Sequence, residues 1–181
     1  MGTETPRLVE PTVALESAFR SLVEDYRAAG EDRYQNIPEL AGDDFDAYVR
    51  RLDEKSRGIG LRPDHVPQTT FWLVRGSTTI VGTSRLRHRL TPALEQEGGH
   101  IGYDVSPSER RKGYGTRLLA LTLEKARARG LQRVLVTCDT DNVASARIIQ
   151  RNGGQLAGEV ISARSGKPVS RYWIRLQSQD E

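Results

Sequence analysis

The sequence contains one cysteine, Cys138, among its 181 residues. A single cysteine excludes an intrachain disulfide framework and a zinc site built from several cysteines. The three histidines, His65, His88 and His100, do not show the spacing of metal ligands. We therefore expect no structural metal.

Long apolar runs are also missing. No stretch approaches the roughly 20 residues that a membrane-spanning helix needs, and the first residues, MGTETPRLVEPTVALE, lack the basic and apolar regions of a secretory signal. We therefore expect a cytoplasmic protein with no membrane partner. Because 36% of the residues are hydrophobic, the chain can form one ordinary core, and we predict a single domain over residues 1–181.

Charge is divided unevenly along the chain. Residues 1–60 contain 8 Lys and Arg against 13 Asp and Glu, whereas residues 61–181 contain 19 against 11. The basic part suits an anionic ligand such as a phosphate or a nucleic acid, and the acidic part suits a cationic one. Solvated surface charges would give the same pattern in the acidic part.

The spacing of apolar residues predicts a mixed α/β protein in the order β-α-α-β-β-β-α-β-α-β-β. A short edge strand is expected at 7–11, with helices over 12–30 and 43–58 and an irregular segment over 31–42. The later elements are strands over 69–76, 77–90 and 98–105, a helix ending near Ala128, a strand over 133–139, a helix from Asn142, and strands over 154–162 and 169–176.

A basic, glycine-containing turn precedes the third predicted helix, in the stretch SERRKGYGTRLL. A helix that begins there presents unpaired backbone N–H groups at the positive end of its dipole. Gly113 and Gly115 lack the Cβ atoms that would keep a phosphate away, and Arg110, Arg111 and Lys112 add positive charge. The stretch therefore predicts a pyrophosphate cradle, although a helix start with solvated arginines would look similar.

Other readings of this turn fail at particular positions. A dinucleotide-binding fingerprint requires glycine where Leu118 stands, and a P-loop requires Ser or Thr after Gly-Lys. The letters KGYG match the start of an RNA-recognition strand, but its later aromatic positions would fall on Thr116 and Leu119. We therefore consider nucleic acid an unlikely partner.

The stretch VSPSERRKGYGTRLL resembles motif A of the GNAT superfamily of acetyl-CoA-dependent N-acetyltransferases, whose signature is Gln/Arg-x-x-Gly-x-Gly/Ala. The following RVLVTCDTDNVASARIIQRNGG resembles motif B of that superfamily, and the order and spacing hold over 69–176. The stretch GGHIGYDVSPSERRKGYGT also resembles the corresponding stretch in a bacterial group of predicted acetyltransferases without defined acceptors.

The resemblance implies the GNAT fold, in which a mixed, largely antiparallel central sheet is splayed at the cofactor cleft and has helices on both faces. Residues 69–176 would form the acetyl-CoA-binding core. Residues 1–68, an N-terminal strand and two helices, would border the acceptor site. The resemblance is also compatible with a homodimer.

The resemblance further implies which residues contact the cofactor. The backbone near Asp104 would bind the pantetheine arm and the thioester, the basic turn would bind the pyrophosphate, and Asn142 would bind a cofactor amide. Asn142 has a second expected role, as a helix cap. The implied cofactor-binding residues are Asp104, Val105, Arg110, Arg111, Lys112, Gly113, Tyr114, Gly115, Thr116, Asn142 and Ser145.

The expected chemistry is direct attack of a neutral amine on a thioester, with backbone N–H groups stabilising the oxyanion. The position of the tyrosine acid in many relatives is Ile149 here, and the position of the usual glutamate base falls near Gly99. Tyr103 and His100 are therefore our candidate catalytic residues. Tyr172 is a third candidate, with core packing as its competing role.

These observations predict an N-acetyltransferase that uses acetyl-CoA. A catalytically silent coenzyme A-binding or sensor module is the alternative, and a basic nucleic-acid-binding domain is a weaker one. Because the N-terminal part is acidic, we expect a small-molecule or peptide amine with positive charge as the acceptor. We expect some of the acidic residues there to hold it, from the set Glu31, Asp32, Glu39, Asp43 and Asp44.

Overall fold

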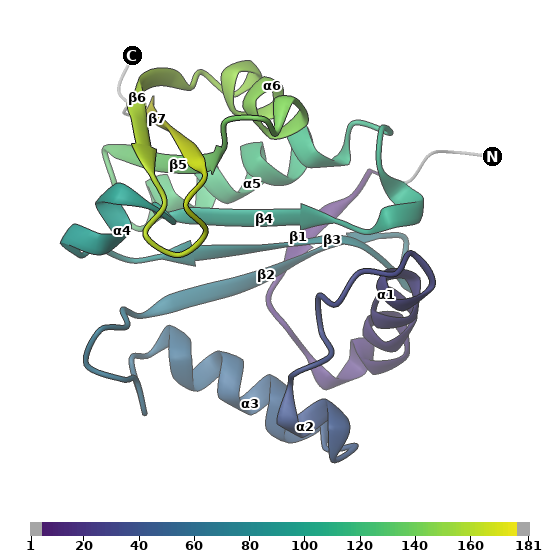
Figure 1. Cartoon of the computed structure of the whole chain (residues 1–181). Coiled ribbons are helices and arrows are strands. Elements are labelled where there is room, and N and C mark those ends of the chain that lie inside the picture. Colours follow the sequence, from purple (N-terminus) through teal and green to yellow (C-terminus); the bar gives the residue numbers. More distant parts are fainter. Residues whose placement is uncertain (1–4, 177–181) are drawn as a thin grey trace.

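The structure, a computed structural model, describes residues 5–176. This part of the chain forms seven strands and six α-helices (Figure 1). The elements are β1 Arg7–Val9, α1 Glu16–Ala28, α2 Pro38–Ala41, α3 Phe45–Ser56, β2 Gln68–Arg75, β3 Thr79–Arg87, α4 Pro92–Gln96, β4 Ile101–Val105, α5 Tyr114–Ala128, β5 Arg133–Asp139, α6 Val143–Arg151, β6 Gln155–Ile161 and β7 Pro168–Arg175.

The strands form two antiparallel sheets, one with the order β1-β2-β3-β4 and one with the order β5-β7-β6. Figure 1 shows α1 and α3 against one face of the four-stranded sheet, and α5 and α6 on the opposite side. The predicted mixed α/β architecture, with a splayed and largely antiparallel sheet between helices, is confirmed.

The two sheets meet where β4 begins. The His100 N–H donates to the Leu135 carbonyl at 2.7 Å, and the Leu135 N–H donates to His100 Nδ1 at 3.0 Å. A Cβ atom on Gly99 would lie 2.4 Å from the Leu135 carbonyl oxygen, so only glycine permits this approach. Within residues 5–176, β4 and β5 share no ladder, so the two sheets part from this junction toward Val105, and we call the region between these two strands the gap.

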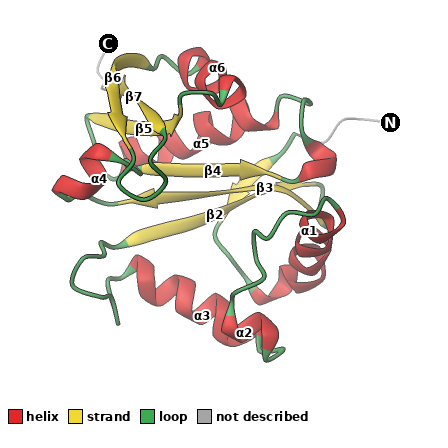
Figure 2. Ribbon diagram, in the orientation of Figure 1, coloured by secondary structure: helices red, strands yellow, loops and turns green. Residues whose placement is uncertain are grey.

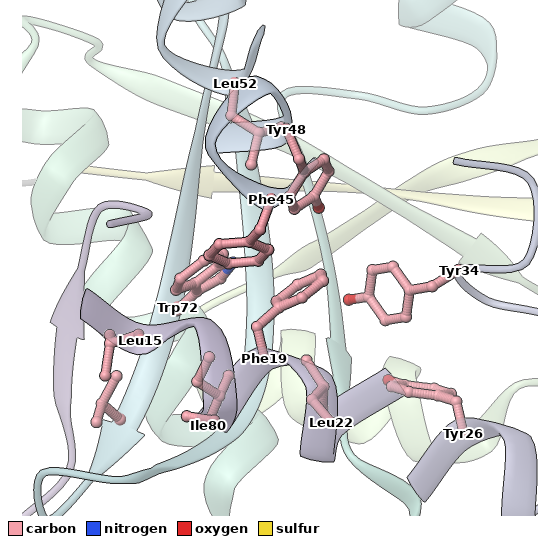
Figure 3. Close-up of a cluster of buried hydrophobic side chains, with 12 residues drawn as sticks. Leu15, Phe19, Leu22, Tyr26, Tyr34, Phe45, Tyr48, Leu52, Trp72 and Ile80 are labelled. Atoms are coloured by element: carbon pink, nitrogen blue, oxygen red, sulfur yellow. The ribbon is translucent and has the colours of Figure 1, made fainter. Parts of the chain in front are cut away.

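An aromatic cluster fills the space between α1, α3 and the four-stranded sheet. Phe19 lies between Trp72 and Tyr34, with ring centroids 5.0 Å and 5.2 Å away (Figure 3). Both helices are amphipathic, so their apolar faces pack onto β2 and β3. A second cluster, which includes Leu119 and Val134, lies between α5 and the strands.

Two short helices differ from the prediction. Helix α2 lies in the segment 31–42, which we expected to be irregular, and α4 follows β3 within the chain (Figure 2). Both begin with proline at the first helical position, which fixes φ at a helical value. Helices of four or five residues are too short to show apolar periodicity, so the pattern could not reveal them.

Candidate functional site

A row of free backbone N–H groups leads into α5. The six N–H groups from Arg111 to Thr116 donate to no acceptor within residues 5–176. Gly113, with φ of +84°, is the N-cap of this 15-residue helix. These N–H groups lie at the positive end of the helix dipole and suit a pyrophosphate.

The two glycines of this row have different structural roles. A Cβ atom on Gly113 would meet no heavy atom within 4 Å, so this position opens into free space where a ligand can approach. A Cβ atom on Gly115 would lie 2.6 Å from Ile148 Cδ1. Gly115 is therefore required for the packing of α5 on α6, whereas we expected both glycines to make room for phosphate.

Two of the three basic side chains at the turn are already paired with carboxylates. Arg110 donates to both Glu31 oxygens at 2.7 and 2.8 Å, and Lys112 Nζ lies 3.0 Å from Glu109 Oε2. The hydrogen bond with Arg110 lowers the pKa of Glu31. Arg111 is exposed and pairs with no carboxylate of the described chain. Of the three basic side chains expected to add positive charge at this turn, only Arg111 has no carboxylate partner in the described chain, and it lies beside the free N–H groups.

Helix α1 holds the turn between β4 and α5 through Asp25. Its carboxylate accepts hydrogen bonds from the Ser108 N–H and hydroxyl, each at 3.0 Å, and from the Ser106 hydroxyl. Burial raises the pKa of Asp25, but the hydrogen bonds from Ser106 and Ser108 outweigh it and lower the pKa overall. The position of the turn therefore depends on the N-terminal helix.

Within residues 5–176, no strand pairs with the edge of β4 that faces the gap, although the Val105 carbonyl there accepts hydrogen bonds from the Tyr26 hydroxyl and from Arg110 Nε, each at 3.2 Å. The Arg87 N–H donates to His100 and the Ser106 N–H donates to Val81, so even-numbered residues of β4 point their main-chain groups toward β3. Because main-chain groups alternate along a strand, those of Tyr103 and Val105 point into the gap. Such an edge can pair with the amides of a pantetheine arm.

Tyr103 and Ser145 meet across this gap. The Tyr103 hydroxyl lies 2.8 Å from Ser145 Oγ, and burial raises the pKa of Tyr103 to about 12. Asn142 caps α6 by accepting from the Ser145 N–H at 3.0 Å, as expected for its capping role. Half-buried Cys138 packs against the same cluster of side chains as Tyr103, and burial raises the pKa of its thiol.

The two other candidate catalytic residues, and Ile149 at the position of the family's tyrosine acid, are buried. His100 is 6% exposed, its Nδ1 already accepts a hydrogen bond, and burial together with Arg87 and Arg133 lowers its pKa to about 4. Tyr172 is 5% exposed within the core, which agrees with its packing role, and Ile149 is fully buried. The structure thus brings Tyr103 to the gap with Ser145, but places His100 at the junction of the sheets.

Asp104 is surrounded on the side of the sheet that faces α1. Its carboxylate accepts from the Tyr26 hydroxyl at 2.8 Å and contacts Arg33 and Arg85. Burial and the Asp104 charge raise the pKa of Tyr26 above its usual range. Residues 78 positions apart carry no sequence signal of this contact, so only the backbone of Asp104 was expected to matter.

The acidic residues expected to hold a cationic acceptor are all engaged within the chain. Glu39 pairs with Arg51, and Asp43 pairs with Arg20. Asp44 accepts from the Ala47 N–H as the N-cap of α3. Glu31 and Asp32 contact Arg110 and Gln35. These contacts offset part of the negative charge expected to attract the acceptor, and a cationic acceptor stays a prediction.

A basic hollow of about 270 Å³ lies between the loop after α1, helix α3 and strands β2 and β3. Its cationic side chains are Arg33, Arg51, Lys55 and Arg85.

The described part of the chain contains neither a candidate metal site nor a candidate membrane-spanning helix. No cluster of three or more His, Cys, Asp or Glu side chains within residues 5–176 could hold a metal ion. None of the helices there is both long and apolar enough to cross a bilayer.

Comparison with known proteins places this arrangement in a family. The profile of the acetyltransferase (GNAT) family matches residues 20–154. No curated protein matches the chain significantly.

Solved structures give the same fold at low identity. A ribosomal-protein-S5-alanine acetyltransferase from Vibrio fischeri is 15% identical, with 100% of this chain and 98% of that chain covered and a TM-score of 0.72. RimL, a ribosomal L7/L12 alpha-N-protein acetyltransferase with coenzyme A disulfide-bonded to one of its cysteines, is 18% identical (95% and 94% covered, TM-score 0.66).

A third structural neighbour is the microcin C7 self-immunity acetyltransferase MccE in complex with acetyl-CoA and AMP. It is 14% identical, with 93% of this chain and 91% of that chain covered and a TM-score of 0.66. The family match spans most of the chain and includes both glycine-containing motifs. The chain therefore belongs to the GNAT acetyltransferase family.

Proposed function

We propose that this protein is an acetyl-CoA-dependent N-acetyltransferase that transfers an acetyl group to a primary amine by direct attack in a ternary complex. The observation that carries the proposal is the run of six free N–H groups, Arg111 to Thr116, directly after the edge of β4 that faces the gap. An anion site next to an open strand edge suits a ligand with a pyrophosphate at one end and amides in its arm.

The residues of this chain divide the binding between them. The N–H groups of 111–116 would hold the pyrophosphate. The main-chain groups of Tyr103 and the N–H of Val105 would pair with the pantetheine arm, and Ser145 would contact it from α6. Structural neighbours bind coenzyme A or acetyl-CoA, which supports this assignment. Acetyl-CoA would supply the thioester, which is the electrophile.

The chain supplies hydrogen-bond donors near this electrophile and lacks an obvious base. The Val105 N–H points into the gap and would stabilise negative charge on an oxygen there. The Tyr103 phenol, with a pKa of about 12, keeps its proton at neutral pH and would donate a hydrogen bond. His100 is neutral at pH 7, but its Nδ1 is occupied. We therefore propose that the amine reacts after losing its proton to water.

A screen of amines tests the proposal. Acetyl-CoA is incubated with the protein and amino acids, polyamines, aminoglycosides or peptides with free N-termini, and released thiol is measured. Binding of acetyl-CoA is measured in parallel by calorimetry. Turnover of any amine supports the enzyme, whereas binding without turnover would support a silent coenzyme A-binding module. Steeply salt-dependent nucleic-acid binding that coenzyme A leaves unchanged would support the nucleic-acid-binding alternative.

A further inference from the structure

The basic hollow has a surplus of positive charge. Four cationic side chains from three segments, namely the loop after α1, helix α3 and strand β3, line it, and two carboxylates from outside the lining reach them. Asp104 contacts Arg33 and Arg85, and Glu39 contacts Arg51. Two carboxylates against four cations leave a net surplus of two positive charges, and among the four cations only Lys55 has no carboxylate partner within residues 5–176.

Lys55 is the clearest unpaired charge. It is half-buried near the end of α3, and its ammonium group forms no ion pair within residues 5–176. Burial lowers the pKa of Lys55, the cations Arg51 and Arg62 lower it further, and Glu39 partly opposes them. An anion bound beside Lys55 would relieve this repulsion, because opposite charges at close range favour the charged form.

The hollow is placed to hold an acceptor. Thr83 and Arg85 of β3 line it, and they pair with Asp104 and Gly102 of β4. A ligand in the hollow therefore lies next to the strand whose far edge faces the gap. The volume of about 270 Å³ lies just below the range of roughly 300–1,000 Å³ that is typical of ligand sites. This volume fits a metabolite-sized molecule.

We propose that the amine acceptor carries a carboxylate or phosphate group, and that the hollow binds this group through Lys55 and Arg85. The inference rests on the proposed acetyltransferase function and adds the class of substrate. It differs from the cationic acceptor that the acidic N-terminal composition suggested, and four of the acidic side chains there have partners within the chain.

Matched pairs of amines test this preference. Acetyl transfer is measured for phosphoethanolamine against ethanolamine and for β-alanine against β-alaninamide, at equal acetyl-CoA. We expect kcat/KM to be about tenfold higher for the anionic member of at least one pair, because a hydrogen bond to a charged group contributes about 1.4 kcal/mol or more. Equal or better use of the uncharged members would overturn the inference and leave the acetyltransferase function standing.

Charge variants locate the preference in the hollow. Lys55→Gln removes an unpaired cation without leaving a carboxylate alone, and should reduce the advantage of the anionic amine several-fold through KM, with unchanged KM for acetyl-CoA. Lys55→Glu should reverse the preference. The control Lys167→Gln alters an exposed lysine between β6 and β7 and should have no effect. An anion preference that both Lys55 variants retain would place its source elsewhere.

If no amine is acetylated, the proposed function fails, and binding alone decides this inference. Phosphoethanolamine is then titrated by calorimetry into protein saturated with coenzyme A, so that the anion site at α5 is occupied. Binding that is lost in Lys55→Gln and kept in Lys167→Gln would support an anion site in the hollow. Absence of binding to the parent protein would overturn it.

Discussion

His100 Nδ1 accepts a hydrogen bond from the Leu135 N–H at 3.0 Å, while the His100 N–H donates to the Leu135 carbonyl at 2.7 Å. The pair joins β4 to β5 where the two sheets meet. Further along, the strands share no ladder within the described residues, so this junction fixes the closed end of the gap. A protonated imidazole carries a hydrogen on Nδ1, so it could no longer accept the hydrogen bond from the Leu135 N–H.

The stability of the protein should therefore fall in mild acid because of His100. Its pKa is lowered from 6.5 to about 4 in the folded state, so the unfolded chain takes up a proton first as the pH falls. The contribution is complete above about pH 6.5 and is lost toward pH 4, on the order of 3 kcal/mol of unfolding free energy. Urea denaturation over this pH range measures it.

His100→Asn provides an acceptor that does not titrate, and should flatten this part of the pH profile. His65→Asn, at an exposed histidine outside the junction of the sheets, serves as the control and should keep the parent slope. If the unfolding free energy of His100→Asn falls with pH as steeply as that of the parent, the acid sensitivity comes from other groups.

The larger features of the fold could be predicted from the sequence because they depend on local patterns. The helix periodicity around Phe19 and Phe45 and the strand texture of 69–76 gave α1, α3 and β2 close to their observed bounds. The free N–H groups after β4 followed from the basic turn and its two glycines.

The side-chain partners could not be predicted, because they join residues far apart in the chain. Arg110 meets Glu31 at a separation of 79 residues, so its charge looked available to a phosphate. The basic hollow combines Arg33, Lys55 and Arg85 from three segments within a region whose overall composition is partly acidic. Net charge along the sequence does not reveal which charges are paired.

Valine at Gly113 should abolish tight acetyl-CoA binding with a modest loss of stability. A side chain would occupy the free space before the N–H row, and the positive φ costs roughly 1–2 kcal/mol for a residue with a Cβ atom. Gly130, after the other end of α5, has φ of +87° and equally free surroundings, so Gly130→Val is the matched control. Calorimetry should show lost affinity only in Gly113→Val.

Equal affinity for acetyl-CoA in Gly113→Val and Gly130→Val would show that the pyrophosphate does not bind at this turn. Gly115→Val is expected to act differently, because its Cβ would overlap Ile148 and destabilise the contact of α5 with α6 by about 1–3 kcal/mol. Thermal unfolding separates this packing effect from loss of the ligand site.

Acetyl-CoA should protect Cys138 from thiol reagents. The residue is half-buried on β5 in the cluster that includes Tyr103, and burial raises the pKa of its thiol, so modification should already be slow. A pantetheine arm between β4 and β5 would slow it further, by about tenfold at saturation. Because the chain has one cysteine, intact mass reports the reaction directly.

Gly113→Val should lose this protection at the same acetyl-CoA concentration, whereas Gly130→Val should keep it. Modification of the parent protein at an unchanged rate under saturating acetyl-CoA would contradict the proposed path of the pantetheine arm.

Tyr103→Phe should lower turnover several-fold without abolishing it. The phenol pKa of about 12 means that the parent keeps this proton throughout the range from neutral pH to about pH 10. Its loss by titration therefore cannot produce a descending limb in that range, and the rate should rise with pH as the amine acceptor loses its own proton. A profile of kcat/KM against pH measures both effects.

Tyr172→Phe is the matched control, because Tyr172 is buried in the core and its hydroxyl forms no hydrogen bond within residues 5–176. It should reproduce the parent profile. A coenzyme A thiolate, with a thiol pKa of about 8.5, can leave near neutral pH without a strong acid, so a hydrogen bond from Tyr103 suffices. A falling limb below about pH 10 that disappears in Tyr103→Phe would instead make Tyr103 the general acid, with a pKa well below the value that burial gives it here.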